Sequence, residues 1–358
     1  KLLAAFDDRD IFIDPNPDPK KSYAERRRMF NLPRSSWEDY DKNLISKGGG
    51  VFSRKLKSIE LTAEMKILFG LDDDITSLAP NDLIQAILTS HVDLLWFGGI
   101  GTYVKSKSES NGAAGDRAND AIRINGKDLN CKVIGEGGNL GCTQLGRIEY
   151  CLKGGMMNTD AIDNSAGVDC SDNEVNIKIL LNSIVADGKI TKKKRDALLE
   201  EMTDEVAGLV LRDNYLQTQA ISLTKTSSVL ELDSFERYLD ELERSASLDR
   251  ELEFLPNGED LEERAEKSLG LTRPENAVLI AYAKMALFDS ITDSNLLDDP
   301  YLEKFLFRSF PKKLSKNYKN EIRSHQLRSQ IIAKVLCNDI VNRGGIQAIK
   351  EETGASGA

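Results

Sequence analysis

The stretch CKVIGEGGNLG, residues 131–141, is an apolar run that passes directly into a glycine-rich turn. A short apolar run bounded by glycines is typical of a buried strand in a parallel sheet. A second run of the same form, VDLLWFGGIG, occupies residues 92–101. We therefore expect two buried strands, each of which ends in a glycine turn.

Helical patterns lie between and after these runs, with apolar residues three and four positions apart in LTAEMKILFGL (61–71), APNDLIQAILTS (79–90) and TQLGRIEYCLKGG (143–155). Strands that alternate with helices predict an α/β fold with a parallel sheet. A further strand is expected at residues 1–6, and SYAERRRMFNL (22–32) predicts a helix with Ser22 as its N-cap. After about residue 188 only long helical patterns remain.

The fold class that follows is a Rossmann-like, doubly wound α/β domain over residues 1–188 and an all-α domain over residues 189–358. No G-x-G-x-x-G fingerprint is present, so the nucleotide fold is expected to lack its first strand and glycine loop. The chain opens KLLAAFDD without an initiating Met and stops after ETGASGA without a helix cap. We expect it to be part of a longer protein.

Composition disfavours several classes of function. The 358 residues carry a net charge of -10, which disfavours binding to nucleic acid or to an anionic membrane surface. No apolar run reaches the ~18–20 residues of a membrane span, so a cytoplasmic protein is expected. The five cysteines include no C-x-x-C pair, and we expect neither a metal site nor a disulfide framework.

Candidate site residues follow the expected strands. Ligands of open parallel sheets lie beyond the carboxyl ends of the strands, and Asp7, Gly98 and Gly99 occupy such ends. A carboxylate there can accept hydrogen bonds from an adenosine ribose and repel a 2′-phosphate, although Asp7 taken alone is better explained as an ordinary helix-cap or turn residue. Glycine allows a ligand to approach the backbone closely, but glycine turns after strands are common.

Two asparagines and a serine complete the candidates. Asn139 and Asn164 each offer a paired donor and acceptor suited to a carboxamide or a ribose, and asparagine is also a good turn residue. Ser171 precedes the helical pattern SDNEVNIKILL. It could be a simple N-cap, which the spacing favours, or could hold a substrate carboxylate at a helix start.

Long stretches of the chain resemble the large bacterial NAD-specific glutamate dehydrogenases. They are DIFIDPNPDP, LPRSSWEDYDKNLISKGGGVFSR, VDLLWFGGIGTYVK, GDRANDAIR, VIGEGGNLG, NTDAIDNSAGVDCSDNEVNIKILLN and LRSQIIAKVLCNDIVNRGG. The resemblance covers nearly the whole chain. It implies NAD as cofactor, Asn139 and Asn164 around the nicotinamide half of NAD, Asp7 at the adenosine ribose, and Ser171 at the distal carboxylate of glutamate.

The resemblance also implies the reaction, which is oxidative deamination of L-glutamate to 2-oxoglutarate and ammonia in a full-length enzyme that forms a homo-oligomer. The catalytic lysines and the general-acid aspartate of this family belong to a domain upstream of the nucleotide fold, and no segment here matches it. The catalytic residues are therefore unassigned. A branched-chain or aromatic amino-acid dehydrogenase, and a non-catalytic nucleotide-binding or oligomerisation module, remain alternatives.

Overall fold

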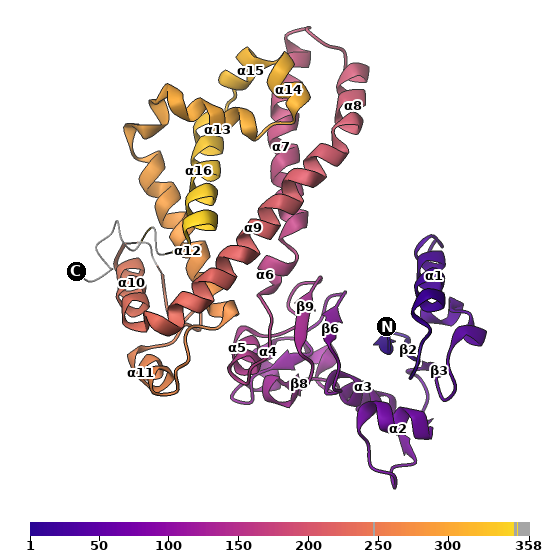
Figure 1. Ribbon diagram of the computed structural model, residues 1–358. Helices are drawn as coiled ribbons and strands as arrows, with labels where there is room; N and C mark the ends of the chain where they lie inside the picture. Colours follow the sequence, from indigo (N-terminus) through magenta and orange to yellow (C-terminus); the bar gives the residue numbers. More distant parts are fainter. Residues whose placement is uncertain (246–247, 347–348, 350–358) are drawn as a thin grey trace. The chain divides into compact units, whose positions relative to one another are not determined.

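The computed structural model describes residues 1–245, 248–346 and 349, and the chain divides into two compact units, Lys1–Met156 and Met157–Ala358. The first unit mixes strands and helices, whereas the second is helical (Figure 1). The expected order, an α/β part followed by a helical part, is confirmed. Within the part expected to be helical, residues 246–247, 347–348 and 350–358 lie outside the described residues. The expected functional division at residue 188 stays a prediction.

The first unit contains short strands in small sheets. Its strands are β1 (Ala4–Phe6), β2 (Asp10–Ile13), β3 (Gly50–Ser53), β4 (Ile59–Glu60), β5 (Ser77–Leu78), β6 (Leu94–Phe97), β7 (Val104–Lys105), β8 (Ile124–Asn125) and β9 (Val133–Glu136). Its helices are α1 (Pro19–Phe30), α2 (Ala63–Phe69), α3 (Pro80–Leu88), α4 (Asn111–Ala114) and α5 (Gln144–Leu152). Strand β6 pairs with β9, and β7 with β8, in parallel.

The N-terminal segment differs from the expectation. Strands β1, β2 and β3 form an antiparallel sheet, where a strand of a parallel sheet was expected. The reason is the connection, because a three-residue turn can join only antiparallel neighbours, whereas parallel strands need a long crossover. Helix α1 also begins earlier than expected, with Asp18 as its N-cap and Pro19 as its first residue, so Ser22 is a buried helical residue.

Strand β6 is less buried than its apolar sequence predicts. Leu94 and Trp96 are 55% and 58% exposed, whereas Phe97 is buried. Successive side chains of a strand point to opposite faces, so one face of β6 is covered within the described residues and the other is open. The apolar pattern predicted the strand correctly and its burial wrongly.

The second unit is built from long helices. They are α6 (Asp160–Asp163), α7 (Ser165–Ala186), α8 (Lys192–Glu201), α9 (Thr203–Leu230), α10 (Leu232–Ser245), α11 (Gly258–Glu266), α12 (Arg273–Thr292), α13 (Glu303–Arg308), α14 (Lys312–Asn317), α15 (Lys319–Arg323) and α16 (Arg328–Gly344). Helix α9 packs against α7, α12 and α16 (Figure 1). Among the described helices, none combines the length and the hydropathy that a bilayer crossing requires.

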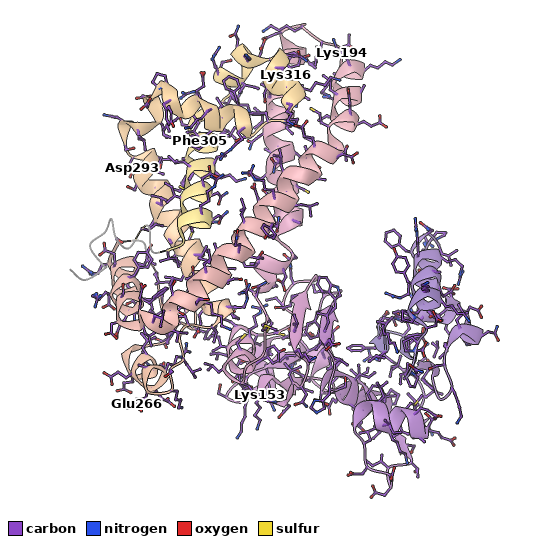
Figure 2. The ribbon with its side chains drawn as sticks, in the orientation of Figure 1. Lys153, Lys194, Glu266, Asp293, Phe305 and Lys316 are labelled. Carbon is purple, nitrogen blue, oxygen red and sulfur yellow. The ribbon has the colours of Figure 1, made fainter. Side chains whose placement is uncertain are left out.

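Two apolar clusters hold the helical unit together. One includes Phe235 and Tyr238 of α10 with residues of α9, α12 and α16, and the other joins the second half of α7 to α8, α13 and α16. Lys194 of α8 and Lys316 of α14 lie at the same end of this unit (Figure 2). There Lys313 of α14 forms an ion pair with Glu201 of α8.

Candidate functional site

Two glycine turns lie at the same edge of the parallel pair β6–β9. Phe97, the last residue of β6, is in register with Glu136, the last residue of β9. The turns 98–101 and 137–141 therefore start side by side at the carboxyl ends of both strands. This is the placement that the two apolar runs predicted, and it is the edge where open parallel sheets bind ligands.

Backbone contacts fix the two turns to each other. The N–H groups of Gly137 and Gly138 both donate to the carbonyl of Phe97, at 2.9 and 3.0 Å. A Cβ on residue 138 would lie 2.4 Å from the carbonyl oxygen of Gly99, which is closer than real Cβ atoms approach. Residue 138 must therefore be glycine in this arrangement. Around Gly99, by contrast, no heavy atom of the described residues lies within 4 Å of a built Cβ, so a ligand could approach this backbone.

A buried ion pair stabilises the second turn, residues 137–141. The guanidinium of Arg147 on α5 donates to Glu136 from Nε at 2.7 Å and from Nη2 at 3.0 Å. The N–H of Cys142, on the far side of the turn, donates to Glu136 Oε1 at 3.0 Å. Glu136 is fully buried and Arg147 nearly so. The carboxylate of Glu136, at the end of β9, thus connects to the residue after the glycine turn, Cys142, and to the N-terminal part of α5.

Asn139 is the exposed polar side chain of this turn. It precedes Leu140, whose φ of 59° is in the left-handed region. A primary amide that is carried on a fixed turn offers one acceptor and two donors at the strand edge. Together with the open backbone at Gly99, this edge has the groups needed to bind a planar carboxamide or a sugar hydroxyl.

Asp7 lies in the hairpin turn between β1 and β2. Its Oδ1 accepts the N–H groups of Arg9 and Asp10 at 2.7 and 2.8 Å. This is the ordinary turn function that the sequence left open for Asp7. The preceding residue, Phe6, packs edge-on against Tyr103 with ring centroids 5.7 Å apart, and Tyr103 stacks on Phe97. The aromatic contacts connect the Asp7 hairpin to the end of β6.

Asn164 and Ser171 both belong to the second unit. Asn164 lies between α6 and α7, next to Asp163, whose Oδ1 accepts a hydrogen bond from Asn158 at 2.7 Å. The Oδ1 of Asn158 accepts a hydrogen bond from Nε of Arg273, the first residue of α12, at 2.9 Å. The turn that carries Asn164 is thereby connected to the start of α12.

Ser171 is an exposed residue inside α7, not at its start. The helix begins at Ser165, because the segment SAGVDC continues the helical conformation in front of SDNEVNIKILL. The expectation that Ser171 stands at a helix start, as its N-cap, is wrong. A substrate role for Ser171 now depends on its hydroxyl alone and stays a prediction.

The structure gathers some of the predicted residues. Gly98, Gly99 and Asn139 share the β6–β9 edge, whereas Asn164 and Ser171 belong to the other unit. In the described parts of the chain, no three His, Cys, Asp or Glu side chains are grouped to hold a metal ion.

Sequence reasoning missed the charged residues that hold the candidate site residues in place. Glu136 and Arg147 gave a signal that could have been used, since a glutamate ends an apolar strand and an arginine lies on the buried face of the next helix. Lys334, which forms ion pairs with α7 on either side of Ser171 in sequence, gave none.

Comparison with known proteins gives matches along the whole chain. Residues 1–224 match the family described as "Bacterial NAD-glutamate dehydrogenase, catalytic domain", and residues 268–358 match "Glutamate dehydrogenase, C-terminal". Proteins named NAD-specific glutamate dehydrogenase from Halomonas elongata and Pseudomonas aeruginosa are 50% and 52% identical over all of this chain. One from Mycobacterium tuberculosis is 50% identical over 97% of it. The chain spans 22% of the length of each of these relatives.

Proposed function

The chain belongs to the family of bacterial NAD-glutamate dehydrogenases, and on this premise we propose that the full-length protein oxidises L-glutamate with NAD. Water supplies the keto oxygen, and the products are 2-oxoglutarate, ammonium, NADH and a proton. The observation that carries the proposal is the family match over residues 1–224, together with the paired glycine turns and Asn139 at one strand edge. Residues 1–188 then form part of a Rossmann-like nucleotide domain, and residues 189–358 form a helical domain.

The edge of β6 and β9 fits a dinucleotide. The open space at Gly99 and the exposed amide of Asn139 suit close backbone approach and carboxamide recognition. When bound, NAD supplies the acceptor for the hydride that leaves the α-carbon of glutamate. We assign Gly98, Gly99 and Asn139 to cofactor binding and Asn164 to the nicotinamide side.

Asp7 is assigned to the adenosine ribose. Its Oδ1 is already used by the turn, so a ribose hydroxyl would donate to Oδ2. A carboxylate at this place would repel the 2′-phosphate of NADP, which accounts for NAD as the cofactor.

Ser171 is assigned to the substrate. Its exposed hydroxyl can donate to the distal carboxylate of glutamate, whereas an apolar side chain would leave that carboxylate without a partner. This favours glutamate over branched-chain or aromatic amino acids. The acid and base that move protons are proposed to come from the part of the full-length protein outside these 358 residues. We further propose that the full-length enzyme is a homo-oligomer.

The test is NADH formation by the full-length protein with L-glutamate, L-leucine, L-valine and L-phenylalanine as substrates. The proposal predicts activity with glutamate and little with the other three. A preference for an apolar amino acid would favour the alternative dehydrogenases. Binding of NAD without turnover of any of the four would favour a nucleotide-binding module.

A further inference from the structure

Helix α7 carries charged residues on the side away from Ser171. In an α-helix each residue is turned by roughly 100° from the one before. Asp169 and Asp172, three positions apart, therefore lie on one face, and Ser171 is turned by roughly 100° from Asp172 and roughly 200° from Asp169. Ser171 is exposed, whereas the side chain of Asp169 is only 16% exposed.

A lysine from the C-terminal part of the chain binds this charged face. Lys334 of α16 forms ion pairs with both aspartates; its Nζ lies 3.6 Å from Asp169 Oδ1 and is also hydrogen-bonded to Asp172 Oδ2. The second pair joins residues that are 162 positions apart in the sequence. The contact therefore connects the region of the catalytic-domain match to that of the C-terminal match.

The positive charge of Lys334 opposes the effect of burial on two nearby carboxylates. Burial raises the pKa of Asp169 and of Asp213 on α9, and in both cases the positive charge of Lys334 acts in the opposite direction. Asp169 Oδ2 is buried and has no hydrogen-bond partner in the described residues. The second cation near these carboxylates, Lys284 of α12, donates a hydrogen bond to Gln217 Oε1 at 3.1 Å. Among the described residues, Lys334 is thus the cation that directly contacts Asp169 and Asp172.

We propose that Lys334 is a positioning residue for Ser171, which it holds in place by fixing Asp169 and Asp172 of α7 against α16. Lys334 does not touch the substrate. It sets the rotation of α7 at the turn where Ser171 projects, and so determines where the serine hydroxyl meets the distal carboxylate. This inference rests on the proposed function, because it concerns the same glutamate site.

The test uses the full-length protein with Lys334→Met, which removes the charge and keeps much of the side-chain volume. A displaced hydroxyl makes a longer or less well aligned hydrogen bond to the carboxylate and so binds it more weakly, and we expect the KM for glutamate to rise by about three- to tenfold. The KM for NAD and kcat should stay within about twofold. Binding of 2-oxoglutarate, measured by isothermal titration calorimetry, should weaken by a similar factor.

Three further variants separate positioning from stability. Lys334→Arg keeps the charge and should restore the KM for glutamate, whereas Asp172→Asn should raise it and add little to Lys334→Met in the double variant. Lys189→Met is the matched control, since Lys189 follows α7 and pairs with Glu321 of α15 at 2.7 Å. It removes an ion pair between the loop after α7 and helix α15, far along the chain from Ser171, and should leave the KM for glutamate unchanged.

The possible failures can be told apart. An unsubstituted protein that neither oxidises glutamate nor binds 2-oxoglutarate contradicts the proposed function itself. An active unsubstituted protein in which Lys334→Met behaves like Lys189→Met contradicts only the positioning role. If Lys334→Met fails to fold, Asp172→Asn and Lys334→Arg decide the question, and an unchanged KM for glutamate in Asp172→Asn would overturn the proposal.

Discussion

The two units support their candidate residues by different means. In the first unit the turn at residues 137–141 is fixed by backbone hydrogen bonds and by the buried pair of Glu136 with Arg147, which is 11 positions away in sequence. In the second unit Ser171 lies on an exposed helix face, and the pair of Asp172 with Lys334 spans 162 positions. One site element is stabilised within a short stretch of chain, and the other depends on distant helices.

Substitutions in the two units should therefore act differently. A substitution at the turns of the first unit should act through a local clash or an unpaired buried charge, and should leave the helices of the second unit folded. A change in the second unit should act through the relative placement of helices. Both tryptophans, Trp37 and Trp96, belong to the first unit, so tryptophan fluorescence reports on that unit, while far-ultraviolet circular dichroism is dominated by the helices.

The largest effect is expected for Arg147→Met. The substitution leaves the carboxylate of Glu136 buried without its cation, and loss of one partner of a buried pair costs about 3–5 kcal/mol. The free energy of unfolding of the 358-residue chain, followed by tryptophan fluorescence in urea, should fall by that amount. The main transition seen by circular dichroism should stay in place.

The control for this variant is Arg9→Met, because Arg9 pairs with Asp8 at 3.7 Å and both side chains are highly exposed. The fluorescence transition of this control should not move. A shift of the fluorescence and circular dichroism transitions together in Arg147→Met would contradict the view that the two units are stabilised separately.

The next largest effect is on the stability of the helical unit, which should depend on pH through the charge of Lys284. Burial lowers the pKa of Lys284 from 10.5 to about 8. Between these values the unfolded chain holds a proton that the folded chain has lost, so the stability of the helical unit should rise as pH increases from about 8 to 10.5. At neutral pH, keeping the partly buried Lys284 charged lowers the stability of the helical unit by up to about 3 kcal/mol, since each pKa unit corresponds to about 1.4 kcal/mol.

The comparison for Lys284 is the Lys284→Met variant, with unfolding followed by circular dichroism at several pH values. The variant should be more stable than the unsubstituted chain at pH 7, and the difference should shrink towards pH 10. A stability difference between the two proteins that is independent of pH would show that the pKa of Lys284 is not lowered in the folded chain.

A smaller effect is expected for Gly138→Ala. Its Cβ would lie 2.4 Å from the carbonyl oxygen of Gly99, so one turn must move, at a cost of about 1–3 kcal/mol. Gly99→Ala is the matched comparison, because its Cβ position is open. Fluorescence-detected unfolding should show a clear loss of stability for Gly138→Ala and a much smaller change for Gly99→Ala; equal losses would contradict the close packing of the turns.

Sequence patterns predicted the features that depend on neighbouring residues. The apolar runs before Gly98 and Gly137 located both strands, and the helical periodicity located α3 and α5. The burial of Trp96 was predicted wrongly, because burial depends on what covers each face of a strand. The position of Ser171 within α7 was missed because a helix start is a weak local signal. The pairing of Lys334 with α7 has no local signal at all.

The measurement that tests the central claim most directly compares Asn139→Ala and Ser171→Ala in the full-length protein, with KM values for NAD and glutamate determined for each. Our account places Asn139 at the cofactor and Ser171 at the substrate. It predicts that Asn139→Ala raises the KM for NAD and spares that for glutamate, and that Ser171→Ala does the reverse. Two variants with unchanged KM values, or with the same KM affected in both, would contradict it.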